Sequence, residues 1–182
     1  METEILQEQS IWYFAYGANM SPDVLVKQRK VNPQKQVIVG LPDYALEFNV
    51  PGVPYSEPAM AGLIRLIHMD KKSTDNVDIV PVYGVAYFIS REDFTKIIAT
   101  EGAGVAYTIL QATAKVVAGV DGEIVGDSLL GKELPVFTLV ARRPARTIRR
   151  PSTRYLVCAP ILSRGFSKVV HRTSELNINR SY

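Results

Sequence analysis

The sequence between residues 11 and 23 reads Ile-Trp-Tyr-Phe-Ala-Tyr-Gly-Ala-Asn-Met-Ser-Pro-Asp. Its first six residues, Ile11–Tyr16, are aromatic, aliphatic or small, which predicts a buried strand that ends at Gly17. The following Ser21 and Pro22 predict the start of a helix, with the serine as N-cap and the proline at the first helical position. The stretch therefore predicts a strand, a tight turn and a helix in immediate succession.

The turn formed by Gly17, Ala18 and Asn19 is a candidate ligand site. Glycine lets the backbone turn sharply and lets a ligand approach it closely. Successive main-chain N–H groups beside a helix start form an anion site, which suits a carboxylate or a phosphate. A plain connection between strand and helix explains the same residues, so both interpretations stay open on the local pattern.

Outward from this junction, the pattern predicts more strands and two more helices. Ser90 caps a helix that starts at Arg91 and ends near residues 100–104, with Asp93 in a carboxylate version of the capping box. A basic connection leads to a terminal helix over 151–170, which Pro160 must break or kink. Irregular loops are predicted over 49–58 and 71–78, and strands over 37–39, 44–49, 59–68, 82–89, 105–117 and 134–140.

The order of these elements predicts an α+β fold whose sheet curls toward a barrel. Strict alternation of strand and helix is absent, which argues against a doubly wound dinucleotide-binding fold. No internal repeat or linker divides the chain. We therefore expect an N-terminal tail over 1–10, one domain over 11–170 and a C-terminal tail over 171–182.

The chain has 182 residues, 47% of them apolar and 21% charged, which is ordinary for a globular protein. Its net charge of +3 hides an asymmetry, because residues 1–140 carry −6 and residues 141–182 carry +9. A basic segment hints at an anionic partner. Six arginines fall between residues 142 and 154, but aromatic residues are poorly interleaved and no recognition motif is present, so we expect no nucleic-acid partner.

The single cysteine, Cys158, excludes an intramolecular disulfide and sits in an apolar context typical of a packed thiol. The spacing of Cys158, His68 and His171 does not favour a metal site. No signal peptide and no run of about 18 apolar residues is found, so we predict a soluble, cytoplasmic protein without a membrane span.

Glu101 is the second candidate for chemistry. It ends the predicted helix beside the glycine-rich Gly102-Ala103-Gly104. The helix macrodipole disfavours a carboxylate at this end, so another group should hold Glu101 there. A partly buried glutamate can take up and return a proton as general base and acid. An exposed capping residue is the equally weighted alternative.

Several segments, taken in order, resemble the γ-glutamylcyclotransferase-like family. Tyr13–Met20 is similar to the family signature Y-F-A-Y-G-S-N-L, and Glu57-Pro58-Ala59 lies in a proline-rich loop like that of the fungal secondary-metabolism type. The other matching segments are Tyr44–Phe48, Tyr83–Tyr87, Phe94–Gly102 with Tyr107, and Pro151–Leu156. Together they span roughly residues 11–165.

The resemblance implies a small mixed β-barrel with flanking helices and a small-molecule substrate. Glu101 would be the catalytic residue of a lyase or acyltransferase that closes a γ-glutamyl group to 5-oxoproline and releases an amine. No metal or organic cofactor is implied, and a homodimer is left open. The implied substrate-binding residues are Tyr13, Phe14, Ala15, Tyr16, Gly17, Ala18, Asn19, Tyr107 and Arg142.

Two positions depart from the family pattern. Ala18 replaces the signature serine, and Arg142 stands where a substrate-contacting tyrosine is expected. A guanidinium there would favour a substrate with a carboxylate or other acceptors. Three outcomes follow: a cyclotransferase acting on a γ-glutamyl conjugate, a diverged cyclase or isomerase of fungal natural-product biosynthesis that uses Glu101, or a scaffold that has lost the chemistry.

Overall fold

Seven strands and three helical segments make up the part of the chain that the structure describes. The structure is a computed structural model and describes residues 10–52, 59–66, 81–101, 105–119, 129–145 and 152. The helical segments are η1 (Ala18–Met20), η2 (Asp23–Gln28) and α2 (Arg91–Thr100). The strands are β1 (Ser10–Ala15), β2 (Lys35–Leu41), β3 (Tyr44–Pro51), β4 (Ala59–Arg65), β5 (Val82–Ser90), β6 (Tyr107–Gly119) and β7 (Glu133–Ala141).

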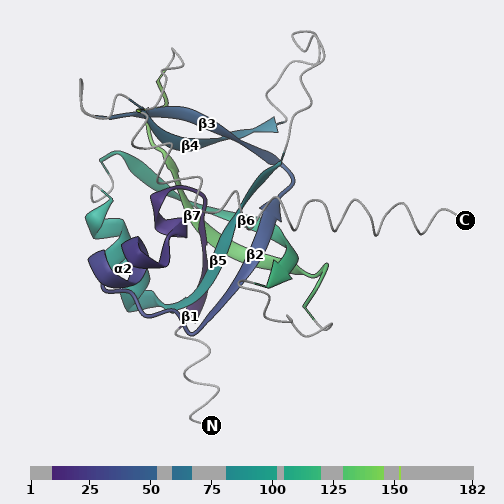
Figure 1. The fold of residues 1–182 in the computed structure, drawn as a ribbon. Helices are drawn as coiled ribbons and strands as arrows, with labels where there is room; N and C mark the ends of the chain where they lie inside the picture. Colours follow the sequence, from purple (N-terminus) through teal and green to yellow (C-terminus); the bar gives the residue numbers. More distant parts are fainter. Residues whose placement is uncertain are drawn as a thin grey trace, which may run out of the picture.

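Five of the strands close into a barrel in the order β1-β5-β2-β6-β7. Neighbouring strands are antiparallel except at the closing pair, where β1 and β7 run parallel and Tyr13 pairs with Phe137. Strands β3 and β4 form a separate two-stranded sheet at the top of Figure 1, while α2 and the η segments lie together on one side of the barrel. The predicted α+β fold with a small mixed barrel and flanking helices is confirmed.

Strand β1 is buried on both faces, which explains its unbroken apolar sequence. Phe14 points into the barrel and is fully buried there. Ile11, Tyr13 and Ala15 alternate with it and face the helical segments. The predicted buried first strand is therefore confirmed, and its two faces contribute to two different cores.

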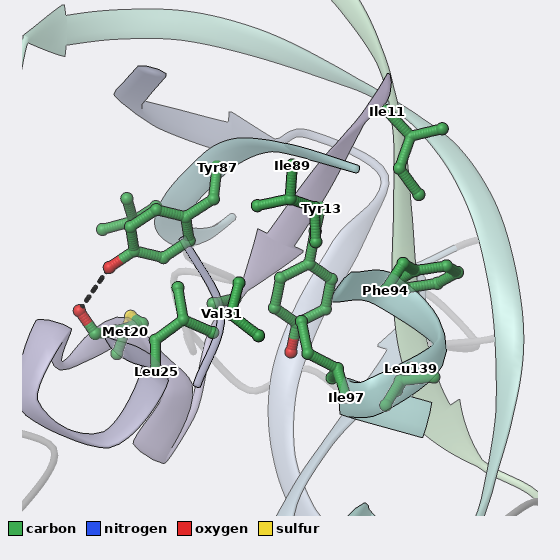
Figure 2. Close-up of a cluster of buried hydrophobic side chains, with 12 residues drawn as sticks. Ile11, Tyr13, Met20, Leu25, Val31, Tyr87, Ile89, Phe94, Ile97 and Leu139 are labelled. Carbon is green, nitrogen blue, oxygen red and sulfur yellow. Dashed lines mark hydrogen bonds between the residues drawn. The ribbon is translucent and has the colours of Figure 1, made fainter. Parts of the chain in front are cut away.

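The outer core lies between the barrel and the helical segments. Figure 2 shows Tyr13, Tyr87 and Ile89 of the barrel clustered with Leu25 of η2 and Ile97 of α2. The Tyr87 hydroxyl donates to the Met20 carbonyl at 2.8 Å, which ties η1 to β5. The barrel interior is filled separately by Phe14, Tyr16, Val37, Val39, Leu41, Ala61, Leu63, Val82, Ala86, Ala114, Val116 and Val136.

Gly84 allows β5 to pass close to β1. A Cβ atom at this position would lie 2.1 Å from the Ala15 carbonyl oxygen and 2.7 Å from the Phe14 ring. Neither the backbone oxygen nor a fully buried ring can move aside easily. The glycine of the Tyr83–Tyr87 segment is therefore required by the approach of two backbones.

The first predicted helix differs from expectation. Residues 18–20 form a 3₁₀ turn and residues 23–28 form a π-helix, so the α-helical period does not hold here. The predicted start is confirmed in position: Pro22 has helical backbone angles, while Ser21 is extended and its carbonyl accepts from the Leu25 amide at 3.0 Å. No side-chain hydrogen bond that caps this helix is found among the described residues.

The second predicted helix is confirmed at its start. The Ser90 hydroxyl accepts from the Asp93 amide at 3.0 Å and caps α2. The Asp93 carboxylate accepts from the Asn32 amide at 3.3 Å and from Lys96 at 2.8 Å. This carboxylate thus connects the first turn of α2 to the segment that follows η2.

The predicted strands all exist, but their ends differ by a few residues. Strand β2 extends to residues 35–41, β3 continues through Pro51 into the predicted loop, β4 stops at Arg65, and β6 is displaced to 107–119. The N-terminal tail up to residue 9, the C-terminal tail, the terminal helix apart from Ser152, the 71–78 loop and Glu57-Pro58 lie outside the described residues. Ser10, assigned to the N-terminal tail, is the first residue of β1. No helix within the described ranges is long and apolar enough to cross a membrane.

Candidate active site

A cavity of about 170 Å³ opens where β1 passes into the 3₁₀ turn. It lies between this turn, strand β4 and the end of α2. Its lining is polar on one side and apolar on the other. The lining residues are Tyr13, Tyr16, Gly17, Ala18, Asn19, Arg29, Met60, Ala61, Glu101, Tyr107 and Leu139.

Glu101 reaches this cavity from the C-terminus of α2. It is the C-cap residue, and its amide donates to the Ile97 carbonyl at 3.0 Å as the last bond of the helix. Its side chain is only 21% exposed. Because the helix macrodipole disfavours an anion at this end, neighbouring donors must compensate for the partial burial of the charge.

Arg29 is the principal compensating group. Its guanidinium forms an ion pair with Glu101 Oε1 and donates to Asn19 Oδ1 and to Thr100 Oγ1. The Arg29 side chain is 16% exposed, so solvent screens this pair less than a surface pair. A cation near the end of α2 also interacts favourably with the macrodipole.

Asn19 links the turn after β1 to the same carboxylate. Its Nδ2 donates to Glu101 Oε1 and to the Tyr13 hydroxyl, each at 2.9 Å. Burial raises the pKa of Tyr13, an effect that the hydrogen bond from Asn19 partly opposes. The Tyr13 side chain is therefore a neutral phenol that accepts from Asn19 and keeps its own proton for another acceptor.

The two oxygens of the Glu101 carboxylate have different environments. Oε1 accepts from both Arg29 and Asn19. No described residue donates a hydrogen bond to Oε2. One oxygen is thus held in place while the other is available to a molecule in the cavity.

The π-helix explains how Arg29 arrives at this place. The Arg29 amide donates to the Val24 carbonyl at 3.0 Å, five residues back, which closes a wider turn than an α-helix has. Lys30 follows with a positive φ of 57°, the left-handed conformation that commonly ends helices. Sequence reasoning missed Arg29, because a single arginine near the end of a polar helical segment carries no distinctive signal.

Glu101 also lines a second cavity, of about 310 Å³. Arg142 lines it, held beside the start of β6 by its amide, which donates to the Ala106 carbonyl at 2.9 Å. Glu101, Tyr107 and Leu139 line both cavities. The remaining lining residues are Ile98, Thr108 and Ile109.

The structure brings together most of the residues that the sequence singled out. Seven of them line the first cavity, and Arg142 joins Glu101 and Tyr107 at the second. Tyr16 donates to the Leu139 carbonyl at 2.5 Å. Phe14 and Ala15 are buried in the inner and outer cores and line neither cavity.

Metal ligation is not indicated within the described ranges, where no three His, Cys, Asp or Glu side chains form a group that could hold an ion. His68, Cys158 and His171 lie outside those ranges. The chemistry that the described side chains offer is acid–base chemistry at one carboxylate, beside the turn that follows β1.

Comparison with proteins of known sequence finds fungal relatives, although no protein-family model matches the chain. The gamma-glutamyl cyclotransferase verK of Clonostachys rogersoniana is 33% identical over 166 residues, which cover 84% of each chain. The gamma-glutamyl cyclotransferase gliK of Claviceps purpurea is 34% identical over 163 residues, 90% of this chain. The match spans only 63% of gliK and 54% of the Aspergillus oryzae relative aclK, which is 30% identical.

Comparison with solved structures supports the fold. A structure described as gamma-glutamyl cyclotransferase has a TM-score of 0.63 at 15% identity, covering 92% of this chain and 86% of the other. The crystal structure of an uncharacterised human protein also gives 0.63 at 15% identity, with 86% and 80% covered. At 15% identity, the likeness to these two structures concerns the fold alone.

Proposed function

Because this chain belongs to the gamma-glutamyl cyclotransferase family, we propose that it is an enzyme that closes a γ-glutamyl group into 5-oxoproline and releases the attached amine. The observation that carries the proposal is the asymmetric Glu101 carboxylate, with Oε1 bonded and Oε2 open to the cavity. General acid–base catalysis needs such a group, positioned but still able to exchange a proton.

The reaction needs one proton to move between two nitrogens. Starting from the neutral amine, the α-nitrogen gives a proton to Glu101 Oε2 and forms a bond to the γ-carbonyl carbon. The bond from that carbon to the departing nitrogen then breaks, and Glu101 returns the proton to this nitrogen. The products are the five-membered lactam and the free amine, so atoms and charges balance without water.

The first cavity would hold the γ-glutamyl end. The turn at Gly17, Ala18 and Asn19 lines it, and the amides that bond within this turn are those of Met20 and Ser21. The earlier amides of the turn can therefore bind the substrate's α-carboxylate. Tyr13, as a neutral phenol, can donate to a substrate oxygen. Holding both reacting ends on either side of Glu101 supplies the proximity that ring closure requires.

The second cavity would hold the amine that leaves. It is larger than the first, and Ile98, Ile109 and Leu139 give it apolar walls. Arg142 adds a guanidinium, which binds carboxylates and other acceptor groups. We therefore favour a bulky, partly apolar γ-glutamyl conjugate with acceptor groups, in keeping with a role in secondary metabolism, over a small γ-glutamyl amino acid.

A second candidate function is a diverged cyclase or isomerase that uses the same carboxylate. The observation that favours it is Ala18, which lines the cavity where the family signature has a serine, so a hydroxyl contact to the substrate is missing. The two functions share Glu101 and differ in whether 5-oxoproline is a product.

The proposal is tested by measuring 5-oxoproline released from a panel of γ-glutamyl conjugates, with wild type and Glu101→Gln. The substitution keeps the side chain's size and one acceptor oxygen but removes the carboxylate that can take up and return a proton. We expect kcat to fall by about 10² to 10⁴, the usual contribution of general acid–base catalysis. Glu92→Gln is the matched control, because Glu92 lies on the same helix and is 81% exposed.

Circular dichroism and thermal unfolding of both variants establish that the fold persists. Wild-type turnover in Glu101→Gln would contradict the mechanism. If no conjugate yields 5-oxoproline, yet a mass-spectrometric screen finds another metabolite converted in a Glu101-dependent way, the diverged cyclase or isomerase is the correct function.

A further inference from the structure

We propose that Arg29 is a positioning residue of this site: it holds the Glu101 carboxylate in one orientation, with Oε1 anchored and Oε2 presented to the cavity. The inference rests on the proposed function for its kinetic meaning, but the placement of Glu101 can be measured without any turnover. Nothing in the chain's motifs indicated this residue.

The first support is that the planar guanidinium of Arg29 donates hydrogen bonds to three different residues. Arg29 Nε, Nη1 and Nη2 donate respectively to Asn19, Thr100 and Glu101. These partners come from the turn after β1 and from the end of α2. The rigid guanidinium fork can hold three acceptors at fixed mutual positions, which a lysine ammonium cannot do in the same way.

The second support is that Arg29 acts on the atoms that set the carboxylate's orientation. Arg29 and Asn19 donate to the same oxygen of Glu101, and Asn19 is itself held at Oδ1 by Arg29. Rotation of the carboxylate would break two hydrogen bonds and separate an ion pair at a largely buried place. The arrangement therefore fixes which oxygen meets the substrate.

The third support is the anchoring of Arg29 itself. Its amide closes the π-turn on Val24, and the guanidinium bond to Thr100 fastens it to the last helical residue before Glu101. The Thr100 hydroxyl donates in turn to the Lys96 and Ile97 carbonyls. The end of η2 and the end of α2 are thus joined through one side chain.

The split between kcat and KM separates positioning from plain structural support. Arg29 contacts Glu101 directly and lines the first cavity. Loss of an interaction that orients the base should lower kcat while KM changes little.

The experiment compares wild type, Arg29→Met, Arg29→Lys and Thr100→Val by 5-oxoproline release. We expect Arg29→Met to lower kcat by about 10²-fold, the scale of a small misplacement of catalytic groups, with KM within about threefold. Arg29→Lys should restore only part of kcat. Thr100→Val should lower kcat a fewfold.

Lys27→Met is the matched control, because Lys27 is an exposed cation of the same π-helix paired with Asp23. It should leave both kcat and KM unchanged. Wild-type kcat in Arg29→Met would overturn the proposal. If Arg29→Met does not fold, full kcat in both Arg29→Lys and Thr100→Val would overturn it instead.

A crystal structure of Arg29→Met tests the placement independently of turnover. We expect the Glu101 carboxylate to leave its wild-type position or to occupy several conformers. An unmoved carboxylate with Oε2 still facing the cavity would refute the positioning role even if 5-oxoproline is formed. If wild-type protein releases 5-oxoproline from none of the conjugates, the proposed function is refuted. The position of the Glu101 carboxylate in wild type and in Arg29→Met then decides the role of Arg29.

Discussion

The two faces of strand β1 serve different purposes although they alternate along one short sequence. The inner face, with Phe14, packs in the core of the barrel. The outer face, with Tyr13, packs against the helical segments, and the Tyr13 hydroxyl accepts from Asn19. Both faces are packed in a core, but the outer face also leads to the polar site.

This difference shows how a reactive group can be placed on a rigid support. Tyr13 has its ring in the outer core, 5.8 Å from the Phe94 ring, and only its hydroxyl meets the polar network. A functional residue whose body is packed loses little further freedom when a ligand binds. A substitution on the inner face should therefore mainly lower stability, whereas loss of the Tyr13 hydroxyl should mainly lower activity.

The largest effect is expected at the inner face, from Phe14→Ala. Removing a fully buried ring leaves a cavity inside the barrel, and we expect the free energy of unfolding to fall by about 3–5 kcal/mol. Urea unfolding monitored by tryptophan fluorescence measures it. A loss below about 1 kcal/mol would mean that the barrel interior can collapse around the missing ring, and the two faces would not differ as described.

A smaller effect is expected at the outer face, from Tyr13→Phe. The ring stays in the outer core and only the acceptor for Asn19 is lost, so the free energy of unfolding should fall by about 1 kcal/mol. Turnover should fall about tenfold, since that is the kinetic equivalent of one such hydrogen bond. Full turnover in this variant would remove Tyr13 from the proposed site.

Wild type and Tyr13→Phe should also differ in how the free energy of unfolding depends on alkaline pH. Burial raises the pKa of Tyr13 in the folded state, so folding stabilises the protonated phenol. This contribution is complete below the unfolded value near about 10 and is lost as the pH rises above it. Wild type should therefore lose stability more steeply than Tyr13→Phe above about pH 10, measured by urea unfolding; parallel curves would contradict this.

The smallest effect is expected from Ala18→Ser, which changes only the rim of the site. The restored hydroxyl adds one hydrogen bond to a γ-glutamyl substrate, so kcat/KM for 5-oxoproline formation should rise by up to about tenfold. The free energy of unfolding should stay within about 0.5 kcal/mol. A decrease in kcat/KM would favour the diverged cyclase or isomerase, whose pocket the hydroxyl would obstruct.

Sequence patterns predicted the parts of the fold that depend on local chemistry. The apolar run Ile11–Tyr16, the Ser90 cap and the position of Glu101 at a helix end follow from burial and capping preferences and are all present. The macrodipole further indicated that some group must compensate Glu101. That group is Arg29, and its identity depends on tertiary contacts.

Other features could not be predicted because they lie outside local rules. The π-turn that ends at Arg29 has a period that helix patterns do not test. The parallel pairing of β1 with β7 joins residues 124 positions apart at Tyr13 and Phe137. The ends of β6 are set by its partner strands, since Tyr107 pairs with Ala141 of β7 and Gly119 pairs with Val37 of β2.

The β1–β7 closure has a consequence for how the molecule is made. The Thr138 hydroxyl donates to the Phe14 carbonyl at 2.8 Å, and Tyr16 reaches the Leu139 carbonyl across the same seam. During synthesis, β1 leaves the ribosome long before its parallel partner exists, and contacts between such distant residues form slowly. The nascent chain must therefore carry its most apolar strand with one edge unpaired until β7 emerges, and this interval is when chaperone binding would matter most.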